Sequence, residues 1–112
     1  MPQILTKDQI KSLKFNNDGL IPVIAQCHKT NEVLMMAWMN KESILLTIKK
    51  NKVTYFSRSR KKLWEKGETS GNYQILKQLI SDCDEDTLLA IVEQKGVACH
   101  TGEWSCFFNR LN

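Results

Sequence analysis

The sequence of 112 residues lacks an apolar run long enough to cross a bilayer. Its longest such run, Val33 to Met39, covers seven residues, whereas a membrane-spanning helix needs about 20. The first residues, Met1 to Asp8, also lack the basic start and apolar core of a signal peptide. A cytoplasmic location without membrane contact is therefore predicted. In that reducing compartment we expect the four cysteines to be free or metal-bound rather than disulfide-paired.

Internal repeats, low-complexity tracts and linkers are absent as well, so residues 1–112 are predicted to form a single domain. Hydrophobic residues make up 42% of the chain and charged residues 25%, which is typical of a soluble globular protein. The net charge of +4 fits an anionic small molecule or a nucleic acid, and it does not decide between them.

The apolar patterns predict an α+β, mostly β domain with two helices and six or seven strands. A capping box at Thr6 and Gln9 predicts a short N-terminal helix, and Asn40 is a good N-cap for a second helix over Lys41–Lys50. The predicted strands are Leu20–Gln26 and Glu32–Trp38, which form a hairpin, then Val53–Phe56, Thr87–Gln94 and Cys106–Phe108. Residues 74–81 fit either a helix or a strand, and residues 57–71 are predicted to be one long functional loop.

Three of the cysteines are spaced too widely for a structural zinc finger. Cys83, Cys99 and Cys106 are separated by 15 and then 6 residues. A catalytic zinc needs three protein ligands and one open position for water, and three cysteines meet that count. Three unconnected thiols are the alternative, and the neighbouring His100 favours zinc. Cys27 lies far from this group and is predicted to be a small core residue.

Three aspartates, Asp82, Asp84 and Asp86, alternate with Cys83 and Glu85. In an extended strand the aspartates would share one face and Cys83 would point to the other. A divalent cation would relieve their mutual repulsion, and carboxylate oxygen suits magnesium or calcium. An acidic strand edge exposed to solvent is the alternative, and the segment does not match the EF-hand pattern.

A basic segment, residues 57–72, holds five basic residues, three serines and two glycines. Guanidinium, hydroxyl and backbone N–H groups are the usual partners of phosphate oxygens. The alternatives are a solvated loop and, because aromatic side chains lie nearby, a nucleic-acid surface, although no known binding motif is present. The residues expected to contact a substrate are Arg58, Ser59, Arg60, Trp64, Lys66, Glu68, Thr69 and Ser70.

Together these segments resemble the phosphoribosyl-AMP cyclohydrolases of histidine biosynthesis. The matching stretches run in order from about Gly19 to Phe108 and are Gly19–Pro22, Glu32–Asn40, Phe56–Arg60, Leu63–Asn72, Asp82–Asp86, Ala98–Gly102 and Ser105–Phe107. The resemblance implies zinc on Cys83, Cys99 and Cys106, and magnesium on Asp82, Asp84 and Asp86. It also implies a mixed, strongly bent, pseudo-barrel-like sheet in which residues 74–81 form a strand. The implied assembly is an intertwined homodimer whose zinc sites take cysteines from both subunits.

The activity that the resemblance implies is hydrolysis of the N1–C6 bond of phosphoribosyl-AMP, which opens the adenine ring to a formimino-carboxamide ribotide. A zinc-bound hydroxide would attack C6, while magnesium and the basic segment hold the substrate. His100 is the candidate general base because the unperturbed imidazole pKa is about 6.5; the alternative for His100 is a structural hydrogen-bond donor.

Two competing functions remain open at this point, a zinc-stabilised interaction module and a nucleic-acid-binding protein. Some relatives carry a second, pyrophosphohydrolase domain. Because this sequence stops at Asn112, that activity is expected from another protein.

Overall fold

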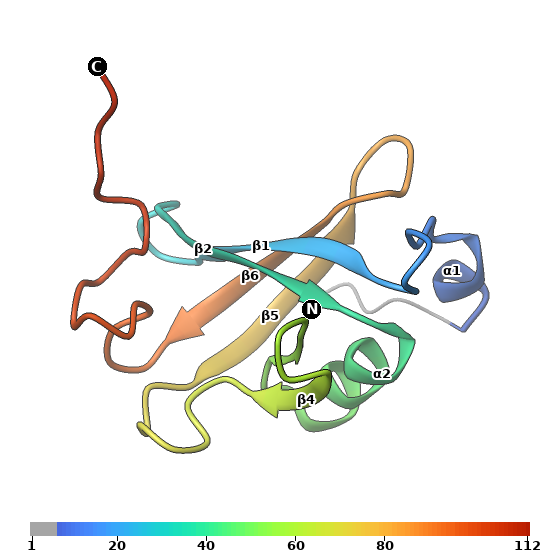
Figure 1. The fold of residues 1–112 in the computed structure, drawn as a ribbon, viewed down its shortest axis with the longest axis horizontal. Helices are drawn as coiled ribbons and strands as arrows, with labels where there is room; N and C mark the ends of the chain where they lie inside the picture. The colour runs from blue at the N-terminus through green and yellow to red at the C-terminus, as the bar shows by residue number, and fades with distance from the viewer. Residues whose placement is uncertain (1–6) are drawn as a thin grey trace.

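The structure is a computed structural model that describes residues 7–112 of the chain (Figure 1). Helix α1 spans Lys7–Ser12, as predicted, and its Ile10 side chain is buried. The predicted cap Thr6 lies outside the described residues. Within them there are two helices and six strands. No described helix is long and apolar enough to cross a membrane.

A four-stranded mixed sheet forms the centre of the molecule, in the order β2-β1-β6-β5. The strands are β1 (Ile21–Cys27), β2 (Val33–Met39), β5 (Gln74–Ser81) and β6 (Leu88–Gln94). Strand β1 pairs antiparallel with β2, and β5 pairs antiparallel with β6. The two hairpins join through parallel pairing of β1 with β6. The mixed sheet is thus confirmed, but it does not close into a barrel, because β2 and β5 are its outer strands.

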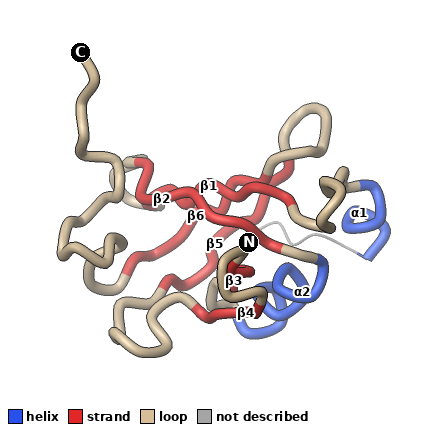
Figure 2. Tube along the Cα trace, in the orientation of Figure 1, coloured by secondary structure: helices blue, strands red, loops and turns tan. Residues whose placement is uncertain are grey.

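A second, smaller layer lies beside this sheet and contains α2 (Lys41–Lys50), β3 (Thr54–Ser57) and β4 (Lys62–Glu65) (Figure 2). Helix α2 has the predicted boundaries. It begins at a capping box between Asn40 and Ser43, and it ends where Asn51 adopts a left-handed conformation. The backbone N–H of Thr54 donates to the Thr47 hydroxyl over 2.9 Å and thereby joins α2 to β3.

Strand β4 corrects the prediction of one long loop over residues 57–71. It pairs antiparallel with β3 and divides the basic segment into two turns, one at each end of the β3–β4 hairpin. The predicted last strand is also wrong, because residues 106–108 do not form a strand, although the Cys106 N–H bonds to β2, and because Phe107 and Phe108 are exposed.

The core lies between the sheet and the smaller layer. Side chains on alternate positions of β1 and β6 are buried, and Cys27 is among them, as predicted. Polar groups are also buried here. The Tyr55 hydroxyl donates to Gln74 Oε1 over 2.6 Å, and Gln74 Nε2 donates to Gln94 Oε1 over 2.9 Å. These bonds satisfy side chains that would otherwise cost free energy to bury.

Candidate functional site

The predicted zinc ligands lie at opposite ends of β6. Cys83 is exposed in the turn between β5 and β6, whereas Cys99 and Cys106 follow the far end of β6 (Figure 1). Strand β6 has seven residues and therefore extends over about 20 Å. The structure brings Cys99 and Cys106 together within the chain, and it keeps Cys83 away from both.

The segment from Ala98 to Cys106, which we call the cysteine loop, folds back on itself. The Gly102 N–H donates to the Cys99 carbonyl over 3.1 Å, and the Cys99 N–H donates to the Glu103 carbonyl over the same distance. Gly102 has a φ of 95°, which favours glycine at this turn. His100 occupies the tip of the turn and is exposed. Its imidazole makes no hydrogen bond with another described residue, so the geometry gives no support to a structural role.

Strand β2 anchors the second half of the cysteine loop. The Cys106 N–H donates to the Leu34 carbonyl over 2.7 Å, and the Ser105 hydroxyl donates to the Val33 carbonyl over 2.8 Å. Trp104 Nε1 donates to Glu32 Oε1 over 3.1 Å. The position of Cys106 is therefore fixed by the outer strand of the sheet.

The two thiols of the loop have different acidities. The Thr101 hydroxyl donates to Cys99 Sγ over 3.0 Å, and this bond, with the Thr101 backbone N–H and the nearby Cys106 thiol, lowers the pKa of Cys99. Burial and the neighbouring Cys99 raise the pKa of Cys106. Thiolates are preferred ligands of zinc. The donor chemistry fits zinc, and one chain offers two of the three predicted ligands at this place.

Lys66, predicted to contact the substrate, lies against the cysteine loop. Its ammonium donates to the Ala98 carbonyl over 2.7 Å. Burial lowers the pKa of Lys66, while Cys106 and Cys99 act in the opposite direction. Trp64, from the same predicted set, packs on Tyr55 with a centroid separation of 5.2 Å. Thr101 and the contact of Lys66 with Ala98 were not predicted, because only the fold brings these segments together.

The predicted magnesium ligands come together, though not as alternating positions of a strand. Residues 82–87 form the turn between β5 and β6, in which Glu85 has a φ of 63°. One carboxylate oxygen from each of Asp82, Asp84 and Asp86 lies within 4.8 Å of the others. This turn, which we call the acidic turn, presents the hard oxygen ligands that magnesium prefers.

Crowding of the carboxylates alters their proton affinities. A hydrogen bond with Asp84 raises the pKa of Asp86, and desolvation and the charges of Asp84 and Asp82 add to this effect. Desolvation would raise the pKa of Asp82 as well, but the backbone N–H groups of Asp86 and Thr87 donate to it and lower that pKa instead. A cation at the acidic turn would relieve the repulsion among the three groups.

The other predicted substrate contacts fall in the two turns of the β3–β4 hairpin. Arg58, Ser59 and Arg60 lie in the turn between β3 and β4, and the Arg58 guanidinium stacks 4.7 Å from the centre of the Trp38 ring. Arg58, Ser59 and Trp38 help to line an open groove of about 560 Å³. Nothing in the sequence pattern pairs Trp38 with Arg58.

The turn after β4 holds the remaining predicted contacts, which are exposed. Glu68 Oε2 accepts from the Glu65 N–H over 3.4 Å, and the Ser70 hydroxyl accepts from the Asn72 N–H over 3.2 Å. Thr69 is exposed in the same turn. In the chain as described, Glu68 and Ser70 therefore stabilise their own turn.

The buried amides connect this turn with the cysteine loop. Gln94 Nε2 lies within 3.5 Å of the Asn72, Tyr73, Lys95 and Val97 carbonyl oxygens. In addition, the Lys95 N–H donates to the Tyr73 carbonyl over 2.9 Å. The turn that carries Lys66 and the start of the cysteine loop are thus held as one unit.

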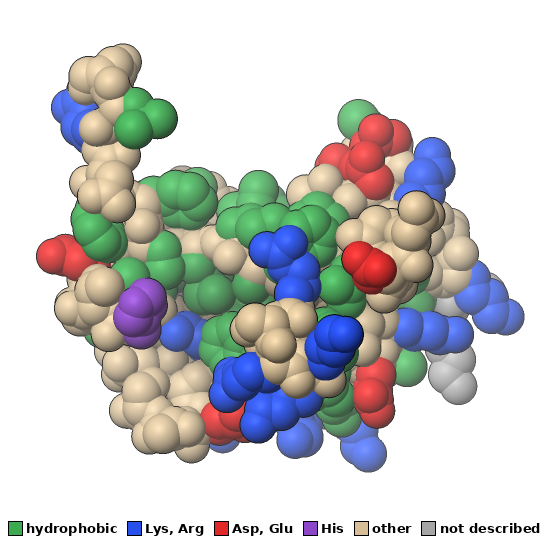
Figure 3. Space-filling view, in the orientation of Figure 1, with side chains coloured by type: hydrophobic (Ala, Val, Ile, Leu, Met, Phe, Trp, Pro, Cys, Tyr) green, Lys and Arg blue, Asp and Glu red, His purple; other side chains and the backbone are tan. Residues whose placement is uncertain are grey.

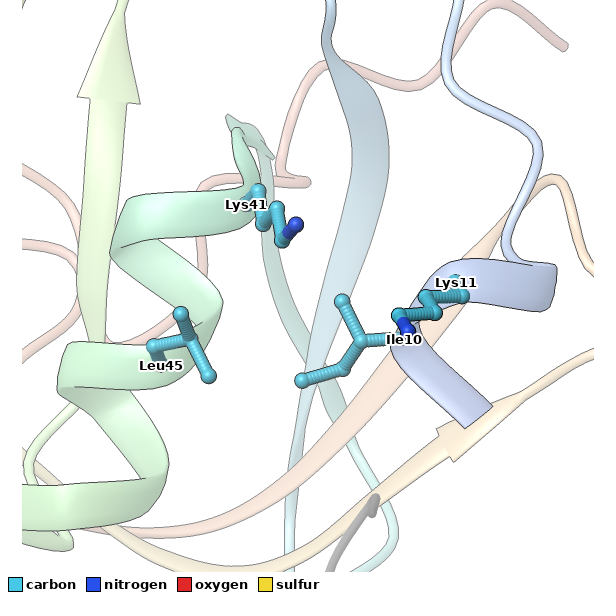
Figure 4. A pocket seen from close by; sticks show the side chains of 4 residues that line it. All are labelled: Ile10, Lys11, Lys41 and Leu45. Atoms are coloured by element: carbon cyan, nitrogen blue, oxygen red, sulfur yellow. The ribbon is translucent and has the colours of Figure 1, made fainter. Parts of the chain in front are cut away.

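A further pocket, of about 250 Å³, lies between α1 and α2. It is lined by Ile10, Lys11, Lys41 and Leu45 (Figure 4). It lies at the end of the molecule away from the cysteine loop (Figure 1) and none of its lining residues was predicted to have a catalytic or ligating role.

Comparison with known proteins identifies the family. A family model of phosphoribosyl-AMP cyclohydrolase matches residues 35–108. A phosphoribosyl-AMP cyclohydrolase from Acidiphilium cryptum is 58% identical over 107 residues, covering 96% of this chain and 92% of the relative. One from Paramagnetospirillum magneticum is 60% identical over 88% of this chain and 75% of the relative.

A longer relative, the histidine biosynthesis bifunctional protein HisIE of Thermoanaerobacter pseudethanolicus, is 56% identical over 92% of this chain and 48% of its own length. The match to the family model, over residues 35–108, includes the basic segment, the acidic turn and the cysteine loop. The chain therefore belongs to the phosphoribosyl-AMP cyclohydrolase family.

Proposed function

We propose that the chain hydrolyses the N1–C6 bond of phosphoribosyl-AMP in histidine biosynthesis. Family membership gives the reaction class. The observation that carries the proposal to particular residues is the cysteine loop, in which the exposed His100 directly follows Cys99 and lies on the loop that returns to Cys106. This arrangement supports a role for His100 as proton acceptor beside Cys99 and Cys106 as soft metal ligands.

Zinc would be held by Cys99 and Cys106 of one subunit and by Cys83 of a second copy of the chain. When bound, zinc supplies Lewis acidity, which makes water a nucleophile near neutral pH. The separation of Cys83 from the other two thiols supports the shared site, because three protein ligands are needed and one chain provides two at the cysteine loop. In such a dimer the acidic turn, which contains Cys83, would lie beside the cysteine loop of the other subunit.

His100 would move the proton in the reaction. One imidazole nitrogen accepts the proton of the attacking water as its oxygen bonds to C6, and the imidazolium then returns that proton to N1 as the N1–C6 bond breaks. Such general acid–base catalysis contributes about 10²–10⁴-fold in rate. Exposure of His100 at the tip of its turn leaves the imidazole free to meet a substrate.

Substrate binding is assigned to the groove and the acidic turn. In the groove, the Arg58 guanidinium and the Ser59 hydroxyl are donors suited to a phosphate group, and stacking on Trp38 orients the guanidinium. Asp82, Asp84 and Asp86 would hold magnesium, which would supply positive charge for the phosphate groups of the substrate. These groups would position the substrate and take no part in bond cleavage.

Exposed apolar side chains support the homodimer. Val33 and Met36 on β2 are each 42% exposed, and Phe107 is 63% exposed in the segment after Cys106. Figure 3 shows hydrophobic side chains gathered across the face between the C-terminal tail and the acidic side chains at the upper right. A second copy of the chain would cover this surface, which is costly to leave in water.

The test is incubation of the purified, zinc- and magnesium-loaded protein with phosphoribosyl-AMP, with the ring-opened product identified by mass. AMP serves as the matched control substrate, because it lacks the N1 ribosyl group that makes C6 electrophilic. Turnover of phosphoribosyl-AMP alone is expected. Failure to form product from a metal-loaded dimer would contradict the proposed function.

A further inference from the structure

The turn after β4 fixes the backbone of Lys66 close to the cysteine loop. The Lys66 N–H donates to the Val53 carbonyl over 2.9 Å. The next residue, Gly67, has a φ of 83°, and a Cβ at this position would lie 2.5 Å from backbone atoms of Asn72 and Tyr73. Only glycine fits so tight an approach. The backbone of the turn is therefore held by contacts that do not involve the Lys66 side chain.

The Lys66 side chain reaches a segment 32 residues away. Its ammonium donates to the Ala98 carbonyl over 2.7 Å and lies 5.8 Å from the centre of the Trp64 ring. Among the described residues Lys66 forms no ion pair with a carboxylate, since the ion pairs found there involve Lys50, Lys77 and Lys95. The thiols Cys106 and Cys99 lie near enough to Lys66 to oppose the lowering of its pKa by burial.

An ammonium group at this place has a consequence for metal binding. Three thiolates put more negative charge around zinc than the ion carries, and a nearby cation offsets that excess. The hydrogen bond to Ala98 also holds the carbonyl of the residue that immediately precedes Cys99. Groups that orient or balance the ligands of a metal in this way typically change its affinity about 10–100-fold when mutated.

We propose, on the basis of the function proposed above, that Lys66 is a positioning residue of the zinc site. Its ammonium holds the Ala98 carbonyl and balances the charge of Cys99 and Cys106 when they bind zinc. This role differs from the phosphate contact predicted from the basic segment. Lys66 would thus act at the zinc site, whereas Arg58, whose guanidinium stacks on Trp38, would contact phosphate in the groove.

The test compares Lys66→Met with Lys66→Arg in the zinc-loaded protein. Methionine keeps an unbranched side chain beside Trp64 and removes the charge and the donor, whereas arginine keeps both. Zinc affinity is measured by competition with a chromogenic chelator, and kcat and KM are measured with phosphoribosyl-AMP. We expect Lys66→Met to bind zinc about 10–100-fold more weakly and to lose kcat, with KM changed less than about twofold. Lys66→Arg should restore most of the affinity.

Lys62→Met is the matched control, because Lys62 is exposed on β4 in the same basic segment. It should bind zinc as the wild type does. If Lys66→Met raises KM and leaves zinc affinity unchanged, Lys66 binds phosphate and the inference is wrong. If Lys66→Met lowers the melting temperature alone, with unchanged zinc affinity and kcat, Lys66 is only structural and the inference is also wrong.

Two further points keep the test decisive. Should Lys66→Met fail to fold, Lys66→Gln removes the charge and keeps a donor, and unchanged zinc affinity in that variant would contradict the charge-balancing role. The zinc measurement does not depend on turnover. If the wild type does not hydrolyse phosphoribosyl-AMP, the proposed function fails, and the zinc affinities of the variants still decide the role of Lys66.

Discussion

The acidic turn and the cysteine loop flank the same strand, yet they differ in how many of the proposed metal ligands each one brings together. In the acidic turn, a single local segment brings three exposed carboxylates within 4.8 Å of one another. The cysteine loop brings two thiols together, and hydrogen bonds join it to β2 and to Lys66. A hard-metal site can thus be local in sequence, whereas the soft-metal site depends on the tertiary fold and, in our proposal, on a second subunit.

The largest expected effect tests whether the cysteine loop depends on Cys83 from a second copy of the chain. Cys83→Ala and Cys106→Ala chains should each be inactive. Unfolded and refolded together, they should form heterodimers in which one site carries both mutations and the other carries none. Random pairing makes about half of the dimers mixed, so activity should return to about a quarter of the wild-type value if sites are independent.

The matched control for this mixing experiment pairs Cys99→Ala with Cys106→Ala. Both changes lie in the cysteine loop, so every site in a heterodimer keeps one mutation and the mixture should stay inactive. Recovery of activity in the control and not in the first mixture would contradict the proposal that Cys83 comes from the other subunit. No recovery in either, with heterodimers shown to form, would mean that each site is built within one chain.

The next effect tests whether His100 in the cysteine loop is a general base or a zinc ligand. His100→Ala should lower kcat about 10²–10⁴-fold, because a general base is lost, while zinc content stays at the wild-type level. Activity and bound zinc are measured on the same sample. Glu103→Gln, an exposed change in the same loop, is the control and should alter neither. Loss of zinc from His100→Ala would make His100 a ligand instead.

At the acidic turn, a smaller effect is expected. Asp84→Asn should raise the magnesium concentration needed for half-maximal activity about tenfold or more, since removing one charged ligand costs at least the roughly 1.4 kcal/mol of a tenfold change. Zinc content should not change, because the substitution leaves the three proposed zinc ligands, Cys83, Cys99 and Cys106, in place. An unchanged magnesium requirement would identify the aspartates as an acidic turn without a metal.

The smallest effect concerns pH. The pKa of Asp86 is raised in the fold by its hydrogen bond with Asp84 and by neighbouring charges. The stability linked to Asp86 is therefore present below its unfolded pKa of about 3.9 and is lost as the pH rises through the higher folded value. Asparagine cannot ionise, so Asp86→Asn should not lose this stability as the pH rises. In magnesium-free buffer, the melting temperature of Asp86→Asn should therefore fall less than that of the wild type above about pH 4.

Magnesium should stabilise the wild type at neutral pH and leave Asp86→Asn almost unaffected. Asp18→Asn, an exposed change in another turn, is the control and should follow the wild type in both buffers. Melting curves recorded from pH 4 to 7 measure both effects. The same magnesium-dependent shift in wild type and Asp86→Asn would remove Asp86 from the metal site.

Helix α2 and strands β1 and β6 could be predicted from the sequence because their signals are local. Asn40 caps α2 through its own side chain, and alternate residues of β1 and β6 are buried. Strand β5 was ambiguous for a physical reason. Its pairing with β6 shifts register between Leu76 and Gln78, so the buried side chains lose their period of two and resemble a helical pattern.

The errors arise where local signals conflict with the fold. The alternation of Asp82 to Asp86 suggested a strand, but Glu85 adopts a left-handed conformation and the segment turns. The carboxylates still come together, because a tight turn gathers side chains as effectively as one face of a strand. The apolar Phe107 and Phe108 suggested a strand, yet they lie on the surface and pair with no strand.

The candidate site shows the same division. The thiols and carboxylates, and the segments that carry them, can be recognised in the sequence, and their binding of zinc and magnesium stays a prediction. Three features of the site could not be predicted from the sequence. They are the contact of Lys66 with Ala98, the stacking of Arg58 on Trp38 and the separation of Cys83 from Cys99. Each depends on contacts between segments that lie far apart in the sequence.

That central pairing also determines when the protein can fold during synthesis. Strand β1 is made early and its partner β6 late, so the nascent chain carries an unpaired, apolar strand edge until most of the polypeptide has left the ribosome. Contacts between such distant parts of a chain slow folding. The cysteine loop directly follows β6, so its thiols reach their positions only in the last stage of folding. If zinc binds as proposed, its two ligands in the cysteine loop therefore come together only after the sheet has formed.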